Sequence, residues 1–285
     1  MLIDTHAHLY WPGYEKDLGE VIQHCLEAEV TTIINVGVDV QLSQKAAEFT
    51  SDKIKFYSTI GIHPHEAVKY KSDKAQVTSN KLRKDAEELE NIYRKNPAKV
   101  VAVGECGLDY FFDHPGLLPN SISINQAKKL QRQLFQAQID LAKKLNLPLI
   151  VHCRDDRSKN PENSEAWDEV LEMVGNHPTI LHCYSGLIHT TKYILHTTNL
   201  LVSFAATITY PKNEYLREAV KLLPLEKIVL ETDCPFLPPQ SKRGQRNEPA
   251  NVLEVTQLIA ELKNVSLEEV CDQTTTNVKK IFQLS

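Results

Sequence analysis

A pair of histidines near the start of the chain has the spacing of a metal site. His6 and His8 lie in the stretch 2–8, whose apolar residues favour a β-strand. Side chains alternate between the two faces of a strand, so both imidazoles project to one side, with Asp4 behind them. Neutral imidazole is the commonest protein ligand of metal ions. An isolated pair of this kind is more often two polar residues at the end of a strand than a metal site. The rest of the chain must therefore supply further candidate ligands.

Further polar side chains occur where other apolar stretches end. His63 and His65 follow 56–62, Glu105 ends 100–105, His152 ends 148–152, His182 lies near the end of 179–183, and Asp233 follows 227–231. Because the strands of a parallel barrel all end on one face, we expect these groups to meet there. The remaining histidines fall in predicted helices or loops and are assigned to the surface: His24, His114, His177, His189 and His196.

The number of these groups indicates two metal ions. One tetrahedral catalytic ion with an open position cannot use all six candidate ligands: His6, His8, Glu105, His152, His182 and Asp233. Strand alternation aims Glu105 at the barrel axis, where its carboxylate can bridge two ions. Two ions about 3.5 to 4 Å apart activate a water and stabilise the leaving oxygen of a phosphodiester. Mixed nitrogen and oxygen ligands suit Zn, Mn or Mg.

Eight apolar, strand-like stretches that alternate with helical ones must position these groups. They are rich in Val, Ile and Leu and lie at 2–6, 31–36, 56–62, 100–105, 148–152, 179–183, 200–204 and 227–231. Eight strands joined by crossover helices predict an α/β fold, the (β/α)8 TIM barrel. The alternative is an open doubly wound sheet with a glycine-rich phosphate loop after its first strand. Neither GxGxxG nor GxxxxGK[ST] occurs in the sequence.

The segments between the strands predict helices and two long connections. An apolar stripe of period 3.6 predicts a helix over 126–145, and a solvated helix is expected over 79–95. The connections 66–97 and 111–125 follow strands at the end where barrel sites are built, so each is either a wall of the site or a solvated insertion. Further helices are expected to close and cap the barrel at 252–262, 267–271 and 278–284.

Composition is that of an ordinary globular protein. The chain has 285 residues, 42% hydrophobic and 24% charged, and a single barrel domain over 1–285 accounts for this length. We see neither a signal peptide nor an apolar run of membrane-spanning length, and expect an intracellular protein of the cytoplasm or nucleus. Six cysteines without CxxC spacing indicate reduced thiols. The net charge of -5 gives no general attraction for nucleic acid, but bound metal ions supply positive charge locally.

Seven motifs in order along the chain are shared with a known family. They are DTHAHL at 4–9, GIHPH at 61–65, GECGLDY at 104–110, HCR at 152–154, HCYSG at 182–186, ETDCP at 231–235 and RGQRNEP at 243–249. On this ordered set the chain resembles the TatD-type metal-dependent deoxyribonucleases, a branch of the amidohydrolase-like barrels. The resemblance covers nearly the whole chain and implies a metal-dependent hydrolase that cleaves DNA.

The resemblance also implies roles for single residues. A first metal ion would be held by His6, His8, Glu105 and Asp233, and Glu105 would bridge to a second ion held by His152 and His182. The catalytic groups would be Asp233, which accepts the proton of the attacking water, together with Glu105 and the substrate-side His63. Substrate phosphate would be contacted by His65, Arg154 and Arg243, although the loop with Arg243, Lys242 and Arg246 is equally consistent with a solvated basic loop.

We therefore predict a 3′–5′ exonuclease that acts as a monomer on single-stranded or damaged 3′ ends of DNA, away from membranes. It would leave a 3′-hydroxyl and release a 5′-phosphate nucleotide. One alternative is an amidohydrolase or lactonase, but these often use a carbamylated lysine where this chain has Glu105. Another is a non-catalytic, metal-stabilised barrel that serves as a binding module, although the full set of expected ligands is present.

Overall fold

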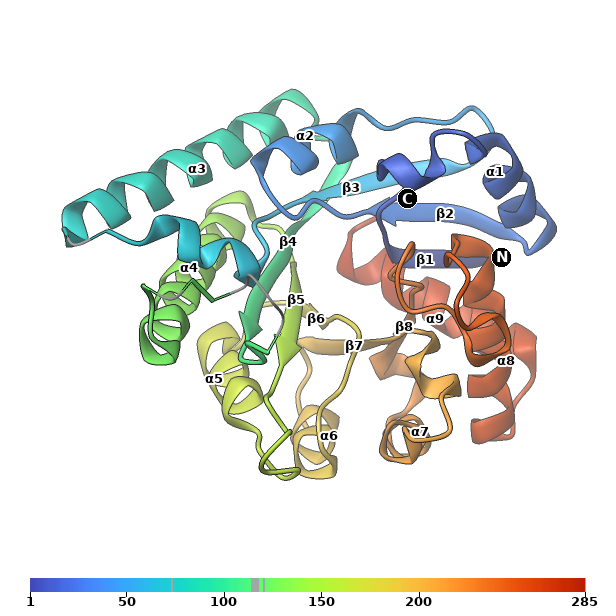
Figure 1. Cartoon of the computed structure of the whole chain (residues 1–285). Coiled ribbons are helices and arrows are strands. Elements are labelled where there is room, and N and C mark those ends of the chain that lie inside the picture. The colour runs from blue at the N-terminus through green and yellow to red at the C-terminus, as the bar shows by residue number, and fades with distance from the viewer. Residues whose placement is uncertain (73, 114–117, 120, 285) are drawn as a thin grey trace.

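The strands form a parallel barrel. The computed structural model describes residues 1–72, 74–113, 118–119 and 121–284. Eight strands pair in chain order: β1 (Leu2–Ala7), β2 (Val30–Asn35), β3 (Lys55–Ile60), β4 (Val100–Asp109), β5 (Leu149–Arg154), β6 (Thr179–Leu181), β7 (Leu200–Phe204) and β8 (Ile228–Leu230). A parallel bridge joins Ala7 of β1 to Cys234, four residues beyond β8, and β8 itself lies in contact with β1. The predicted (β/α)8 TIM barrel is confirmed (Figure 1).

Helices connect the strands and lie around them (Figure 1). After β1 to β7 in turn come α1 (Leu18–Glu27), α2 (Val40–Glu48), α3 (Ala75–Lys95), α4 (Ile124–Leu145), α5 (Glu165–Val174), α6 (Ile188–Leu195) and α7 (Glu214–Leu222), and β8 is followed by α8 (Val252–Lys263) and α9 (Leu267–Ile281). Within the described ranges, no helix combines the length and the apolar character needed to cross a membrane.

Helix α4 fixes the ends of two strands that lead into the site. Its start is set by Ser123, which forms a capping box with the first helical turn. Farther along, the side chain of Gln131 accepts from the backbone N–H of Asp109 and donates to its carbonyl, both at 2.8 Å. Gln138 pairs in the same way with the backbone of Ile62, at 2.7 and 2.8 Å. These two buried amides hold the segments after β3 and at the end of β4 in place.

Strand β4 extends farther than predicted. The sequence suggested an end at Glu105, whereas the strand continues to Asp109, so Glu105 lies inside it. Gly104 and Gly107 have φ angles of 149° and 131°, and a Cβ at either position would collide with a backbone carbonyl of β5. Only glycine permits this close approach. The extension carries Asp109 to the same end of the barrel as the predicted ligands.

The C-terminal helices close the barrel as predicted, but the last two predicted helices are one. Val278 of α9 and Phe282, the residue that follows the helix, pack with Ile3 of β1 and Val229 of β8. The polar run 272–277 interrupts the apolar stripe and made the sequence pattern look like two helices. In the structure this run has its own role, because Asn277 donates to two backbone carbonyls next to β8 at 2.7 and 2.8 Å.

The first long connection is largely helical, whereas the described residues of the second are irregular up to α4, as predicted. The first contains the 3-10 turn Pro64–Tyr70 and α3, which begins four residues before the predicted start at 79. The second, predicted as an irregular loop over 111–125, falls partly outside the described residues, as do His114, Pro115 and Gly116 within it. It ends where α4 begins.

Candidate metal centre

The carboxyl ends of the strands bring all six predicted metal ligands together, with Glu105 in the middle. Glu105 Oε2 lies 3.3 Å from His6 Nε2, whereas Oε1 lies 3.1 Å from His152 Nδ1 and 3.6 Å from His182 Nε2. The two oxygens of one carboxylate therefore face imidazoles from different sides of the barrel. This is the arrangement that a bridging ligand between two metal ions requires.

Asp233 completes the group on the β1 side. Its Oδ1 lies 3.7 Å from His6 Nε2 and 3.5 Å from His8 Nε2. The backbone of Asp233 is left-handed, with φ 57°, a region that aspartate and asparagine enter more readily than most residues. Its N–H donates to the carbonyl of His6 at 2.9 Å, which ties the β8 loop to β1. The carboxylate is thus held beside both imidazoles.

His6 supplies the direct test of whether this site fits a metal ion. Both of its ring nitrogens are buried without a hydrogen-bond partner in the described chain. A buried polar atom left unpaired costs about 1–3 kcal/mol, so each nitrogen favours a partner from outside the chain, either water or an ion. A divalent ion on Nε2 is such a partner. The neighbouring His8 fits as well, because its Nδ1 lies 3.0 Å from the carbonyl oxygen of Val36 and its Nε2 faces the site.

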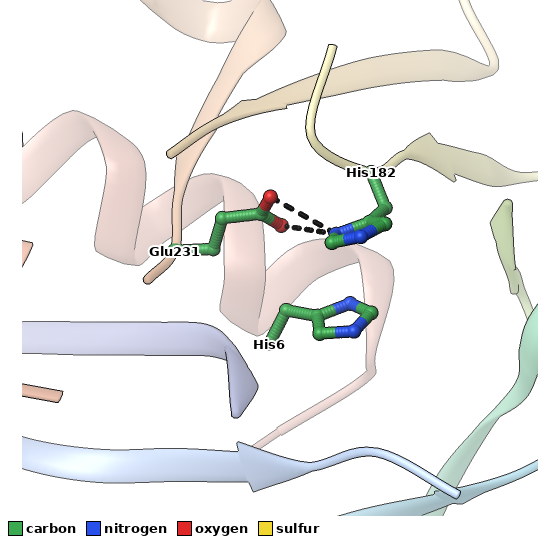
Figure 2. Close-up of side chains that lie close together, drawn as sticks. All are labelled: His6, His182 and Glu231. Atoms are coloured by element: carbon green, nitrogen blue, oxygen red, sulfur yellow. Dashed lines mark hydrogen bonds and ion pairs between the residues drawn. The ribbon is translucent and has the colours of Figure 1, made fainter. Parts of the chain in front are cut away.

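A buried glutamate missed by the sequence analysis orients His182. Each oxygen of Glu231 lies 2.9 Å from His182 Nδ1, as the dashed lines of Figure 2 show. Glu231 also accepts hydrogen bonds from the N–H of Cys183, at 2.8 Å, and from the hydroxyl of Ser203. The proton on Nδ1 leaves Nε2 free to face Glu105. Carboxylates behind metal-binding histidines are common, and the ETDCP motif was the available signal.

Replacing Glu231 with glutamine should weaken metal binding by about 10- to 100-fold. Without the carboxylate, the orientation of the His182 ring is less well fixed and its Nε2 becomes less basic. Titration of the metal-stripped protein, with ion content read by fluorescence or calorimetry, measures this. The matched control is Glu226→Gln, at an exposed position outside the site. Unchanged affinity in a variant that melts like the parent would contradict the assigned role.

Asp109 orients a second histidine and was also missed, because the strand was expected to end before it. Its Oδ2 lies 3.1 Å from His152 Nε2 and 2.8 Å from His65 Nε2. His152 therefore turns its other nitrogen, Nδ1, toward Glu105. Asp109 is 1% exposed, so its charge is offset by the imidazoles rather than by water. The signal for Asp109 in the sequence was the GECGLDY motif.

His63 lies at the cluster as well. Its Nε2 is 3.3 Å from Glu105 Oε1, and the possible ligand atoms of His63, Glu105 and His152 lie within 4.8 Å of one another. Its Nδ1 accepts from the N–H of His65 at 3.2 Å, so the neutral ring carries its proton on Nε2. In that state His63 donates toward Glu105. His63 thus lies beside the central carboxylate, and its substrate-side role stays a prediction.

Three buried carboxylates of the cluster have pKa values below their usual range. Burial by itself raises the pKa of Glu105, but the neighbouring imidazoles, His63 and His182 among them, outweigh it and hold the pKa well below its usual value. Burial is likewise outweighed at Asp109, where hydrogen bonds from two imidazoles lower the pKa, and at Asp233, where His8 does so. Carboxylates with lowered pKa values are suitable ligands for divalent cations.

The same charges raise the pKa of two imidazoles. Burial lowers the pKa of His182, but Glu231 and Glu105 outweigh it and raise the pKa to about 9. Hydrogen bonds to carboxylates likewise outweigh burial at His152 and raise its pKa to about 10. At His63 burial prevails and lowers the pKa to about 4. In the absence of metal ions, His152 and His182 therefore hold protons at neutral pH.

Metal binding should consequently release protons at pH 7, because only the unprotonated imidazole binds a metal ion. Both groups have pKa values raised above neutrality, so the proton competes most strongly at low pH, and metal affinity should rise as pH increases toward about 9. Calorimetric titration in two buffers of different ionisation enthalpy counts the protons. An identical heat in both buffers would contradict this expectation.

Of the groups predicted to contact phosphate, His65 borders the cluster through Asp109, and the two arginines stack on aromatic rings. The side chain of His65 is 32% exposed. The guanidinium of Arg154 lies 4.0 Å above the ring of Phe111. That of Arg243 lies 4.6 Å above the ring of Tyr210 and donates to its hydroxyl at 3.0 Å. Such stacking holds both cations in place.

Other polar residues of the loop between β8 and α8 have structural partners. Arg246 forms an ion pair with Asp17 at 2.6 Å, and Lys242 donates to Asn251 at 2.6 Å. The buried Asn247 donates to three backbone carbonyls of the same loop, at 2.7 to 3.3 Å. Asn247 therefore fixes the loop.

Cysteines next to the acidic residues do not face the metal centre. Cys106 and Cys234 are fully buried, and the thiol of Cys106 donates to a backbone carbonyl of β5 at 3.5 Å. Burial raises the pKa of both thiols. All six cysteines of the chain are free. These two act as packing groups.

This chain is similar to known proteins over its whole length. Residues 3–283 match the family model described as TatD related DNase. "Uncharacterized metal-dependent hydrolase YabD" of Bacillus subtilis (strain 168) is 34% identical over 285 residues, covering 100% of both chains. "3'-5' ssDNA/RNA exonuclease TatD" of Pantoea ananatis is 30% identical, covering 99% of this chain and 100% of that one. The crystal structure of YJJV, a TatD homologue from Escherichia coli K12, has a TM-score of 0.80 at 26% identity and covers 100% of this chain and 98% of its own. With this fold and this cluster of ligands, the chain belongs to the TatD related DNase family and is a metal-dependent hydrolase.

Proposed function

We propose that this hydrolase is a two-metal 3′–5′ exonuclease that trims single-stranded or damaged 3′ ends of DNA. The observation that supports it most is Glu105, whose two oxygens face separate groups of imidazoles. The Pantoea ananatis relative is named a 3'-5' ssDNA/RNA exonuclease, which supports both the direction and the preference for single strands.

We assign one group of candidate ligands to each of the two ions. The first ion would be held by His6, His8, Glu105 and Asp233, and the second by Glu105, His152 and His182. Two divalent ions, Zn, Mn or Mg, would supply an activated water and stabilise the leaving oxygen of the phosphodiester. The protein holds the ligating imidazoles ready through bonds to their other nitrogens, such as those from Glu231 and Asp109.

Asp233 is the group best placed to accept the proton of the attacking water. Its side chain is 14% exposed, against 6% for Glu105, so it reaches the substrate side of the cluster. Its lowered pKa keeps it ionised at neutral pH, as a proton acceptor must be. His63, which donates toward Glu105, would keep that carboxylate oriented during the reaction.

Substrate phosphates would be bound on the outer side of the cluster. Arg154 and Arg243 would offer N–H donors there, because a guanidinium binds two phosphate oxygens at once. His65, whose Nε2 donates to Asp109, would join them through Nδ1–H in its imidazolium form. Water attacks the phosphorus, the bond to the 3′-oxygen breaks, and that oxygen takes up a proton. The products are a strand that ends in a 3′-hydroxyl and a nucleoside 5′-phosphate.

The proposal extends to the whole chain, which would act as one barrel domain and as a monomer. Pairing of each strand with its neighbours supports this, because a closed barrel leaves few strand edges to pair with another chain. The free cysteines support a location inside the cell, in the cytoplasm or nucleus, where thiols stay reduced.

A 5′-labelled single-stranded oligonucleotide tests the proposal, incubated with the metal-loaded protein beside the matching RNA and the matching duplex. We expect a ladder that shortens from the 3′ end on the DNA single strand. A circular single strand should stay intact, since it has no 3′ end. Cleavage of the circle would reveal an endonuclease, and hydrolysis of lactones without any cleavage of nucleic acid would favour the amidohydrolase alternative.

A further inference from the structure

Two exposed aromatic side chains lie at the rim of the metal centre. Trp11 is 37% exposed and Phe236 is 46% exposed. Their ring centroids are 5.7 Å apart with an interplanar angle of 76°, so they form an edge-to-face pair. Large aromatic rings gain most free energy when buried, and this pair leaves much of its surface to solvent. It therefore offers apolar, flat surface to a ligand.

The pair is built against a proposed metal ligand. The ring of His8 lies 6.5 Å from that of Trp11 and 6.1 Å from that of Phe236, centroid to centroid. His8 Nε2 in turn faces Asp233. Whatever stacks on these rings therefore lies next to the side of the cluster where the attacking water is expected.

The backbone holds both rings in place. The N–H of Trp11 donates to the carbonyl of His8 at 3.0 Å, and the N–H of Phe236 donates to the carbonyl of Asp233 at 2.9 Å. The carbonyl of Phe236 also accepts a hydrogen bond from the buried Asn247 at 2.7 Å. Each ring is thus tied to the same turn as a site residue. A ligand that stacks there needs little ordering of the protein.

We propose that Trp11 and Phe236 form a stacking platform for an unpaired nucleobase next to the scissile phosphodiester. This inference rests on the proposed nuclease function and adds the group that selects single strands. Every base has a π-face, so stacking on aromatic rings binds single strands without regard to sequence. A base inside a duplex is already stacked and paired, and it would have to be extruded first at a cost of a few kcal/mol.

The charge of the protein makes such a platform useful. With a net charge of -5, its surface gives no general attraction for the phosphate backbone. Base stacking supplies binding free energy that does not depend on positive charge. The alternative role for the two rings is to shield His8 from water, in which case the presence of a base in the substrate would not matter.

A double-mutant cycle between protein and substrate separates these roles. Trp11→Ala/Phe236→Ala should raise KM for a DNA single strand about 5- to 100-fold, the effect of losing one stacked base, with a much smaller change in kcat. Oligonucleotides with one abasic nucleotide, either terminal or penultimate at the 3′ end, are the second arm. For one of these two abasic strands, the KM of the parent enzyme should rise by the same factor as the alanine substitutions cause on the normal strand. The KM of the double variant should be no higher for that abasic strand than for the normal strand.

Two further variants complete the design. Trp11→Phe/Phe236→Tyr keeps both rings and should restore most of the affinity. Tyr193→Ala removes a 55% exposed ring of α6, away from the site, and should change nothing. Equal losses by the double alanine variant on normal and on both abasic strands would reject the platform and favour a shield for His8. No loss on any strand would also reject it.

Binding can be measured without turnover, in the metal-stripped protein. The chain has two tryptophans, and Trp167 is fully buried, so quenching of the exposed indole reports on Trp11. A normal single strand should quench it more than the strand with the sensitive abasic position. If a strand quenches the fluorescence but the metal-loaded enzyme does not hydrolyse it, the stacking platform is supported and the nuclease function is rejected. Hydrolysis without base-dependent quenching would keep the nuclease and reject the platform.

Discussion

Replacement of Asp233 by asparagine is expected to lower kcat on single-stranded DNA by about 10²–10⁴-fold, the usual contribution of a positioned general base. The amide has the shape of the carboxylate but cannot accept the proton of the attacking water. The backbone at Asp233 is left-handed, and asparagine tolerates this conformation as well as aspartate does. The hydrogen bond from its N–H to the carbonyl of His6 is also kept. The fold should therefore survive.

This experiment has to be done at saturating metal, because Asp233 is also a proposed ligand of the first ion. Metal content and melting temperature are measured on the same samples. Asp140→Asn, on the exposed face of α4, is the matched control and should behave as the parent. A folded, metal-loaded Asp233→Asn protein with near-normal turnover would remove Asp233 from the role of base.

Removal of the metal ions is expected to abolish hydrolysis completely, and addition of Zn, Mn or Mg should restore it. The double variant His152→Ala/His182→Ala should stay inactive with any of these ions. It loses both imidazoles proposed for the second ion, and Glu105 loses two of its partners. The measurement is hydrolysis of a labelled single strand by metal-stripped protein as each ion is added back.

Stability needs its own control in this experiment. Without the two imidazoles, Glu231 and Asp109 keep buried charges that have lost partners, which is destabilising. The more conservative single variants, His152→Asn and His182→Asn, should therefore be compared with His189→Ala at an exposed position of α6. Parent protein that binds two ions and hydrolyses no phosphodiester would transfer the assignment to a small-molecule hydrolase.

The barrel could be predicted from the sequence because its signals are local. Each strand is a short apolar run followed by a helical pattern, and a parallel sheet buried on both faces needs such runs. The ends of these runs also predicted that the six candidate metal ligands would meet, since all strand ends of a parallel barrel open on one face. Errors occurred where a local pattern was ambiguous, as in α9, where the polar run 272–277 hid a continuous helix.

What the sequence could not determine is which atoms meet. Asp109 orients His152 from the neighbouring strand, and Glu231 reaches His182 across the end of β7, from beyond β8 to beyond β6. Their distances depend on the stagger and tilt of the strands, which the alternation of side chains along one strand does not specify. The length of β4 depended in the same way on the close approach of Gly104 to β5.

By itself, then, the sequence determined the eight-unit barrel, the face on which the site lies and the residue types gathered there. Only the tertiary structure decided that the two oxygens of Glu105 face different imidazoles and that Trp11 meets Phe236 beside His8. The reason is physical. Residue types and periodicity are local properties of the chain, whereas a contact between its two ends exists only once the barrel closes and brings β8 beside β1.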